Sequence, residues 1–166
     1  MKHNINIQHS GKHTAGEIFT KIIKQAVSSA LQFETVDLPC AVNVLIGNDK
    51  VIRKYNRDYR GIDKVTDVLS FPMQIFQKPG WGGCQSPEFD EDTGELPLGD
   101  IVISMERAEE QAAEYGNTPE YETVYLIIHS TLHLLGYDHE NKINEKAMHI
   151  KCEKVMQEMG FKTDDK

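Results

Sequence analysis

The sequence predicts an α+β protein, a single domain in which a mixed sheet of about four strands is packed with helices. Two observations support this fold class. Short β-rich runs alternate with longer segments whose apolar residues repeat at helical spacing. The chain has 166 residues, of which 39% are hydrophobic, so it is long enough to bury one core and short for two. We therefore expect residues 1–166 to form one domain.

These periodicities place the expected elements along the chain. Strands are predicted at 5–8, 39–46, 66–71 and 98–104. Helices are predicted at about 14–31, 48–59, 104–116, 118–135 and 144–159. Thr14 and Glu17 can form a capping box at the start of the first helix, and Ser104 can cap the third. Pro72 ends the third strand, because proline cannot donate to a sheet ladder.

Residues 73–97, between the third and fourth strands, have no periodicity. They collect glycines, prolines and five acidic residues, Glu88, Asp90, Glu91, Asp92 and Glu95. The segment is predicted to be a long surface loop. Loops of this length are uncommon unless they are functional or disordered.

The helix predicted from Thr118 to Leu135 differs from the others. Thr118 can cap it and Pro119 suits its first position. Its apolar residues lie on nearly every side and are Val124, Leu126, Ile127, Ile128, Leu132, Leu134 and Leu135. A helix that is apolar all round is a buried helix, so we expect it at the centre of the domain.

Three histidines in and just after this helix indicate a metal site. His129 and His133 are four residues apart, which puts both imidazoles on one helix face in successive turns. Gly136 can end the helix in the left-handed conformation, and the chain can then bring His139 back to the same face. One histidine on an apolar helix is usually a core residue, but three within eleven residues favour metal binding. Three imidazoles with an open fourth position are typical of catalytic zinc, and we predict one Zn²⁺ per chain.

The spacing also matches the zinc signature of metzincin proteases, H-x3-H-x2-G-x2-H. In those enzymes a glutamate follows the first histidine and acts as the general base. Here that position is Ser130. The pattern therefore favours a metal site and argues against peptide hydrolysis.

Composition limits the compartment and the partners. The formal net charge of −8 works against indiscriminate binding to nucleic acid or to an anionic membrane. There is no apolar run long enough to cross a bilayer and no apolar core of a signal peptide near the first residues. We expect a cytoplasmic protein without a membrane partner.

One predicted helix is basic despite the acidic chain. Six basic residues lie between positions 50 and 64: Lys50, Arg53, Lys54, Arg57, Arg60 and Lys64. Most charge runs are solvated helix faces, and that interpretation suffices for Arg53 or Lys54. Arg60 stands out, because it lies next to the strand that is predicted to enter the core.

Motifs in four places resemble those of one family, the YbeY endoribonucleases of bacteria. The family signature is close to H-G-x-L-H-L-x-G-Y-D-H, and residues 129–139 read HSTLHLLGYDH, with Ser130 in place of the glycine. The family block N-x-x-[FY]-R is matched by Asn56, Tyr59 and Arg60. Asp63 and the run TDVLSFP at 66–72 follow it, and LGDI matches at 98–101, so the resemblance covers about residues 42–160.

The resemblance implies a single-strand-specific, metal-dependent endoribonuclease. Such an enzyme would act in the maturation of ribosomal RNA, including the 3′ end of 16S RNA, and in ribosome quality control. Its implied partners are single-stranded and ribosomal RNA, the small ribosomal subunit and an assembly GTPase, while no DNA partner is expected. His129, His133 and His139 would hold the zinc, Arg60 and His129 are the candidate catalytic residues, and Arg60, Arg57 and Ser70 the candidate RNA contacts. The nucleophile, either a water on the metal or the ribose 2′-hydroxyl, stays open.

Two other functions remain in competition. A ribosome-assembly factor with a mainly structural zinc would show a closed fourth coordination position. A metal-dependent hydrolase of another substrate class would need a carboxylate base, and Asp138 or Asp67 would then lie within reach of a water on the metal.

Overall fold

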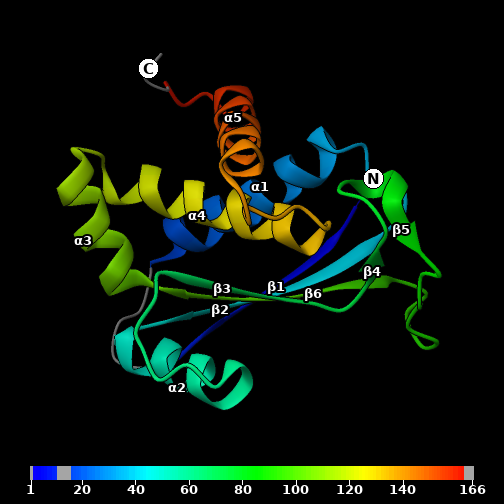
Figure 1. The fold of residues 1–166 in the computed structure, drawn as a ribbon, viewed down its shortest axis with the longest axis horizontal. Helices are drawn as coiled ribbons and strands as arrows, with labels where there is room; N and C mark the ends of the chain where they lie inside the picture. The colour runs from blue at the N-terminus through cyan, green and yellow to red at the C-terminus, as the bar shows by residue number, and fades with distance from the viewer. Residues whose placement is uncertain (1, 11–15, 163–166) are drawn as a thin grey trace.

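The computed structural model describes residues 2–10 and 16–162, in which a four-stranded sheet lies between two layers of helices (Figure 1). The strands, in their order across the sheet, are β1 (Asn4–His9), β2 (Cys40–Gly47), β6 (Leu96–Ser104) and β3 (Val68–Pro72). The first three are parallel, and β3 runs antiparallel to β6 at one edge. The predicted α+β class with a mixed sheet of four strands is confirmed.

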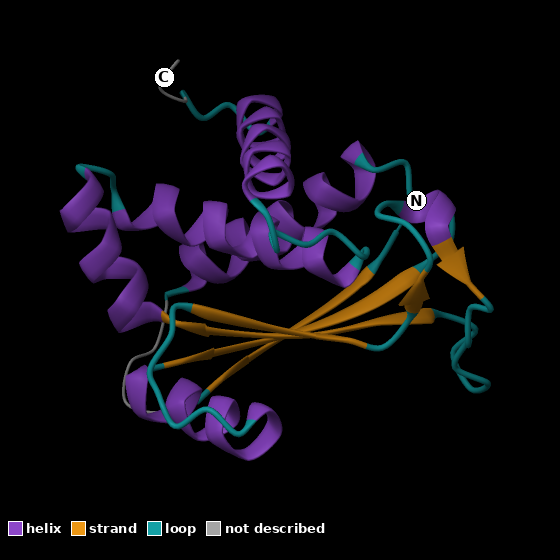
Figure 2. Ribbon diagram, in the orientation of Figure 1, coloured by secondary structure: helices purple, strands orange, loops and turns teal. Residues whose placement is uncertain are grey.

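The helices divide unequally between the two faces of this sheet (Figure 2). One face carries α1 (Glu17–Phe33), α3 (Met105–Tyr115), α4 (Pro119–Leu134) and α5 (Lys142–Glu158), and the other carries α2 (Asp49–Arg60). Parallel strands need a crossover connection, and α1 supplies it between β1 and β2. Side chains alternate accordingly along β2, where Val42 and Val44 are buried under the helices and Asn43 is exposed on the face of α2.

The helix α4 lies at the centre, as its apolar sequence predicts. It contacts α1, α3 and α5 as well as strands β3 and β6. Ile127, Ile128 and Leu132 are completely buried, and the Thr118 hydroxyl caps the helix by accepting a hydrogen bond of 3.1 Å from the backbone N–H of Tyr121. Burial on several sides fixes the rotation of α4 about its own axis, and with it the direction of every side chain on the helix.

The segment 73–97 has more structure than the predicted surface loop. It forms a hairpin of β4 (Ile75–Phe76) and β5 (Cys84–Gln85), with the short 3₁₀ helix η1 (Trp81–Gly83) between them. Its last two residues already belong to β6. Gln74 is buried, and its amide donates to the carbonyl of Pro97 over 2.8 Å. These contacts join residues far apart in the sequence, so local periodicity could not indicate them.

Other element boundaries differ from the predictions by a few residues. The N-cap of α1 is Gly16 and the helix begins at Glu17, while Thr14, the expected cap, lies outside the described residues. Helix α5 begins at Lys142, where the side chain of Asn141 accepts a hydrogen bond from the backbone N–H of Asn144. Among the described residues, no helix combines the length and the apolarity that crossing a membrane requires.

Candidate active site

The three predicted metal ligands converge. His129 and His133 project from successive turns of α4 with ring centroids 4.6 Å apart, and His139 returns from the turn after the helix to within 5.4 and 4.8 Å of them. Each imidazole offers one nitrogen, and these three atoms all lie within 4.8 Å of one another. Among the described residues this is the one group of histidines, cysteines and carboxylates that could hold a metal ion in this way.

The turn that brings His139 back depends on Gly136. Its φ angle is +89°, a conformation that residues with a side chain rarely adopt. A Cβ atom at this position would also lie 2.6 Å from the Cβ of Phe76 in the β4–β5 hairpin. The backbone N–H of Tyr137 donates to the carbonyl of Leu132 over 3.2 Å, which closes the end of the helix. The hairpin therefore packs directly against the ligand-bearing turn.

The hydrogen bonds of His133 determine which of its nitrogens is available. Its Nδ1 lies 2.8 Å from the carbonyl oxygen of Tyr137. A carbonyl only accepts, so Nδ1 carries the proton and Nε2 keeps its lone pair. That Nε2 lies 3.0 Å from the Nε2 of His129, inside the cluster. A ligand histidine whose second nitrogen donates to a carbonyl is typical of protein metal sites.

Burial also holds the imidazoles of His129 and His133 in the neutral form that metal binding requires. Burial, with smaller contributions from His133 and His139, lowers the pKa of His129 to about 4. Burial lowers the pKa of His133 as well. The Nδ1 of His129 is buried without a hydrogen-bond partner among the described residues. Neutral imidazoles whose nitrogens face one another suit a soft or borderline cation such as Zn²⁺, and Nε2 of His133 keeps the lone pair that such a bond needs.

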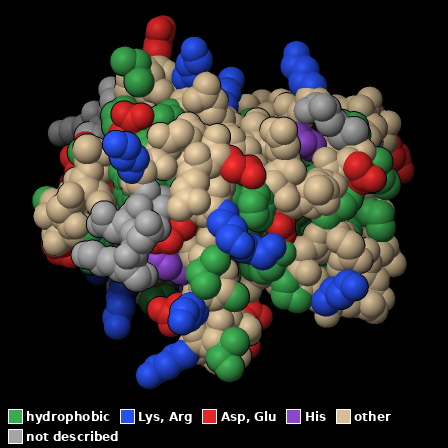
Figure 3. All heavy atoms as spheres, turned by 90° about the horizontal axis from the view of Figure 1, so that it is seen from above, with side chains coloured by type: hydrophobic (Ala, Val, Ile, Leu, Met, Phe, Trp, Pro, Cys, Tyr) green, Lys and Arg blue, Asp and Glu red, His purple; other side chains and the backbone are tan. Residues whose placement is uncertain are grey.

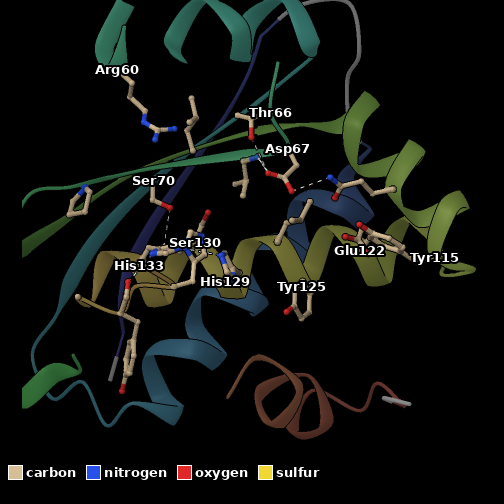
Figure 4. A pocket seen from close by; sticks show the side chains of 18 residues that line it. Arg60, Thr66, Asp67, Ser70, Tyr115, Glu122, Tyr125, His129, Ser130 and His133 are labelled. Carbon is tan, nitrogen blue, oxygen red and sulfur yellow. Dashed lines mark hydrogen bonds between the residues drawn. The ribbon is translucent and has the colours of Figure 1, made fainter. Parts of the chain in front are cut away.

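The histidines lie at an open cleft of about 710 Å³ between α4 and the edge strand β3 (Figure 4). Two of the predicted RNA contacts line this cleft. Arg60 reaches it from the end of α2, and its Nη1 donates to Oδ1 of Asn56 over 3.3 Å. Ser70 reaches it from β3 and donates to the carbonyl of Ser130 over 3.4 Å. Arg57, the third predicted contact, does not line the cleft and forms an ion pair of 3.1 Å with Asp58 on the surface.

Two carboxylates line the cleft that were not predicted as metal ligands or RNA contacts, and of these only Asp67 was considered as a candidate base. Asp67 lines the cleft, and its carboxylate accepts from the backbone N–H of Val68 over 2.7 Å and from the amide of Gln111 over 3.2 Å. Glu122 is a buried carboxyl on α4, and burial raises its pKa. It lies seven residues before His129, on the same helix face, so the helical period could have indicated it. Asp138 does not line the cleft and accepts a hydrogen bond from Asn144.

Tyr125 is a further residue that the sequence did not single out. Its ring stacks on His129 at a centroid distance of 6.3 Å. Its hydroxyl lies 2.6 Å from Nδ1 of His149 on α5, a histidine outside the metal cluster whose Nε2 is 2.9 Å from Glu153. Tyr125 thereby ties α5 to the ring of the first ligand.

A second network supports the turn that carries His139. The Nζ of Lys151 on α5 lies 3.0 Å from the carboxylate of Glu34, at the end of α1, and 4.8 Å from the centre of the Tyr137 ring. Burial and then the Glu34 carboxylate raise the pKa of Tyr137. Because the carbonyl of Tyr137 accepts from His133, the ion pair holds the residue that orients a ligand.

The fold and the site define an α+β protein that presents a three-histidine metal site at an open cleft. Comparison with known proteins places it more narrowly. The family model described as Endoribonuclease YbeY matches residues 4–160. The chain belongs to this family, as its motifs indicate.

Similar proteins extend over most of the chain. Endoribonuclease YbeY of Clostridium kluyveri is 43% identical over 142 residues, which cover 82% of this chain and 86% of the relative. The protein of the same name from Caldanaerobacter subterraneus is 46% identical over 141 residues, or 85% and 87% of the two chains. A solution structure of a Thermotoga maritima protein is 28% identical, has a TM-score of 0.55 and covers 98% of this chain and 99% of its own.

The depressed pKa of His129 predicts how the stability of the metal-free protein depends on pH. Folding keeps this imidazole neutral, whereas the unfolded chain takes up a proton as the pH falls below about 6.5. The free energy of unfolding should therefore be highest above that pH and fall towards pH 4. Denaturant unfolding of chelator-treated protein across this range measures the slope, and His129→Gln should flatten it. Equal slopes in both proteins would contradict the assignment.

The ion pair beneath the turn predicts a loss of metal affinity in Lys151→Met. This change leaves the buried Glu34 carboxylate without its cationic partner and removes the ammonium that lies over the Tyr137 ring. We expect metal binding to weaken by about tenfold, which is the usual effect of losing support behind a ligand. Competition with a chelator measures the affinity. The double variant Glu34→Gln/Lys151→Met removes both charges and should recover much of the loss, and metal affinity that is unchanged in Lys151→Met would refute the positioning role.

Proposed function

We propose that this protein is a metal-dependent endoribonuclease that cleaves single-stranded RNA at the three-histidine cleft. One observation carries the proposal: three imidazoles converge on one side of an open cleft, and the guanidinium of Arg60 lies at the same cleft. A metal site and a guanidinium at one cleft suit a phosphodiester, whose charge rises during cleavage. The names of the relatives support the same reaction.

His129, His133 and His139 would hold the metal, and three imidazoles favour Zn²⁺ at one ion per chain. When bound, this ion supplies Lewis-acid chemistry at the phosphate. The protein contributes the fixed direction of the ligands. His133 is oriented by the Tyr137 carbonyl, and His129 is held against Tyr125.

Arg60 would bind the scissile phosphate. Its side chain is anchored through Nη1 to Asn56, a buried residue whose own amide donates to the carbonyl of Lys64 over 3.0 Å. This arrangement leaves further N–H groups of the guanidinium to make a bidentate contact with phosphate oxygens. Ser70 offers a hydroxyl from β3 on the lining of the same cleft, and Arg57 stays a prediction for an RNA contact outside the cleft.

The cellular role that we propose is the maturation of ribosomal RNA, including the 3′ end of 16S RNA, and ribosome quality control in the cytoplasm. The net charge of −8 disfavours tight binding of free RNA, so partners should contribute to productive affinity. Seen from the side of α5, acidic and basic side chains are intermingled on the surface (Figure 3). The small ribosomal subunit and an assembly GTPase are the partners that the family resemblance suggests.

The openness of the cleft favours catalysis over the alternative of a structural zinc. A structural site is closed by four protein ligands, whereas His139 is exposed and the cleft admits solvent. A hydrolase of another substrate class would need a carboxylate base. Asp138 lies outside the cleft lining, but Asp67 and Glu122 lie in it. RNA remains the preferred substrate because the relatives of this chain are endoribonucleases by name.

We expect about one transition-metal ion per purified chain, with zinc preferred. His133→Ala should lose it, because the remaining two imidazoles cannot complete the site. Elemental analysis after gel filtration tests this, and His9→Ala, which removes a histidine outside the cluster, is the matched control. Undiminished metal in His133→Ala would show that the ion binds elsewhere.

Arg60→Ala should reduce the cleavage of a single-stranded RNA by at least about tenfold, since a charge-assisted contact contributes about 1.5–3 kcal/mol. The side chain is exposed, so fold and metal content should not change. Lys50→Ala, on the same helix but outside the cleft lining, is the control for general charge loss. Near-normal cleavage by Arg60→Ala would reduce Arg60 to a surface charge.

A further inference from the structure

A second hollow lies on the opposite face of the sheet, beside α2. This outer groove has a volume of about 420 Å³ and is lined by aromatic and polar side chains. Its lining includes the aromatic residues Tyr55, Tyr59 and Phe71 and the polar residues Asn43 and Asp100. The histidines of the candidate metal site do not line this groove, and among the described residues no lysine or arginine lines it either.

The three aromatic side chains form a continuous cluster in which Tyr59 is exposed to solvent. Tyr59 stacks on Tyr55 with ring centroids 5.7 Å apart and planes 19° apart, and it meets Phe71 edge-on at the same distance. Although it is held by these two rings, Tyr59 is 71% exposed. A large ring that is positioned by its neighbours and yet open to solvent is well suited to stack on a flat ligand.

The polar residues of the groove are arranged to meet N–H donors. The amide of Asn6 donates to Asn43 over 3.2 Å, and the amide of Asn43 donates to Oδ1 of Asp100 over 2.9 Å. This chain crosses three strands and ends on a carboxylate, which can only accept. A carboxylate repels phosphate but accepts hydrogen bonds from the amino groups of bases, as in contacts with the N4 amino group of cytosine.

The outer groove adjoins the catalytic cleft through β3 and α2. Alternate residues of β3 face opposite sides of the sheet, so Ser70 lines the cleft and Phe71 lines the groove. At the end of α2 the neighbouring residues Tyr59 and Arg60 line the groove and the cleft, respectively. A single strand of RNA that crosses the edge of β3 beside Arg60 would therefore reach both the cleft and the outer groove.

We propose that the outer groove binds one unpaired base of the RNA strand whose phosphate is held by Arg60. The base stacks on Tyr59 and donates an amino N–H to Asp100. This inference rests on the proposed ribonuclease function and deepens it. Only a base that is free of a duplex can turn into the groove, so the groove would select single strands. It also predicts a preference for cytosine over uracil, which presents a carbonyl where cytosine has its amino group.

The test compares Tyr59→Ala with Tyr59→Phe in the metal-loaded protein. Fluorescence anisotropy with labelled oligocytidine gives affinity, and cleavage of a single-stranded RNA gives KM and kcat separately. Stacking on one base corresponds to about a fivefold to hundredfold effect, so we expect Tyr59→Ala to weaken binding by about tenfold and to raise KM. Tyr59→Phe keeps the ring and should bind like the wild type. Phe89→Ala, which removes an exposed aromatic outside both hollows, should change nothing.

Asp100→Asn adds a second readout that a general loss of stability would not produce. The wild type should bind oligocytidine more tightly than oligouridine. In Asp100→Asn the affinities for the two oligonucleotides should lie closer together. If Tyr59→Ala binds and cleaves RNA like the wild type, the groove does not hold a base, and a protein partner becomes its occupant. If the wild type itself neither binds nor cleaves single-stranded RNA, the proposed function fails and this inference falls with it.

Discussion

The burial of α4 is the constraint on which the metal site depends. Core packing on several sides leaves this helix one rotational setting, and that setting directs His129 and His133 to the cleft with their Nε2 atoms 3.0 Å apart. The same burial makes protonation of these imidazoles costly. The pKa of His129 is lowered to about 4, so its nitrogens remain available near neutral pH. The burial of α4 thus accounts both for the direction of these imidazoles and for their neutral form.

Electrostatics make a bound metal the main source of positive charge in the cleft. Among the described residues Arg60 is the one lysine or arginine in the cleft lining, which also includes Asp67 and the buried Glu122. The basic character of α2 is partly neutralised, because Arg53 pairs with Asp63 over 2.8 Å and Arg57 pairs with Asp58. A divalent cation bound by the histidines would change the net charge of the cleft lining from negative to positive, at the place where the phosphate of a substrate would bind. Substrate affinity and metal occupancy should therefore be coupled in this protein.

The sequence was informative where the determining contacts are local. Helical spacing placed His129 and His133 on one face, and Gly136 indicated the turn that returns His139. The strands of the main sheet and the α-helices followed from periodicity, with boundaries displaced by a few residues.

What could not be predicted depends on contacts between distant residues. The order of the strands, the pairing of Lys151 with Glu34, and the position of Asp67 in the cleft all arise from tertiary packing. The hairpin within 73–97 is another example, because Trp81 donates to Asp37, 44 residues earlier in the chain. The sequence singled out Arg60 within the basic helix and also named Arg57 as an RNA contact. The structure shows that Arg60 lines the cleft, whereas Arg57 does not line it and pairs with Asp58 on the surface.

The strand β3 links these features because it is both an edge strand and a shared wall. An unpaired edge normally invites association with another chain, and short strands that end in proline limit this risk. β3 has five residues and ends at Pro72. Among the described residues no strand pairs with its other edge, and Arg60, at the end of α2, lines the cleft together with Ser70 of β3. If the strand were covered by another element, the metal site would retain its ligands, but a polymeric substrate would lose the route from one face of the sheet to the other.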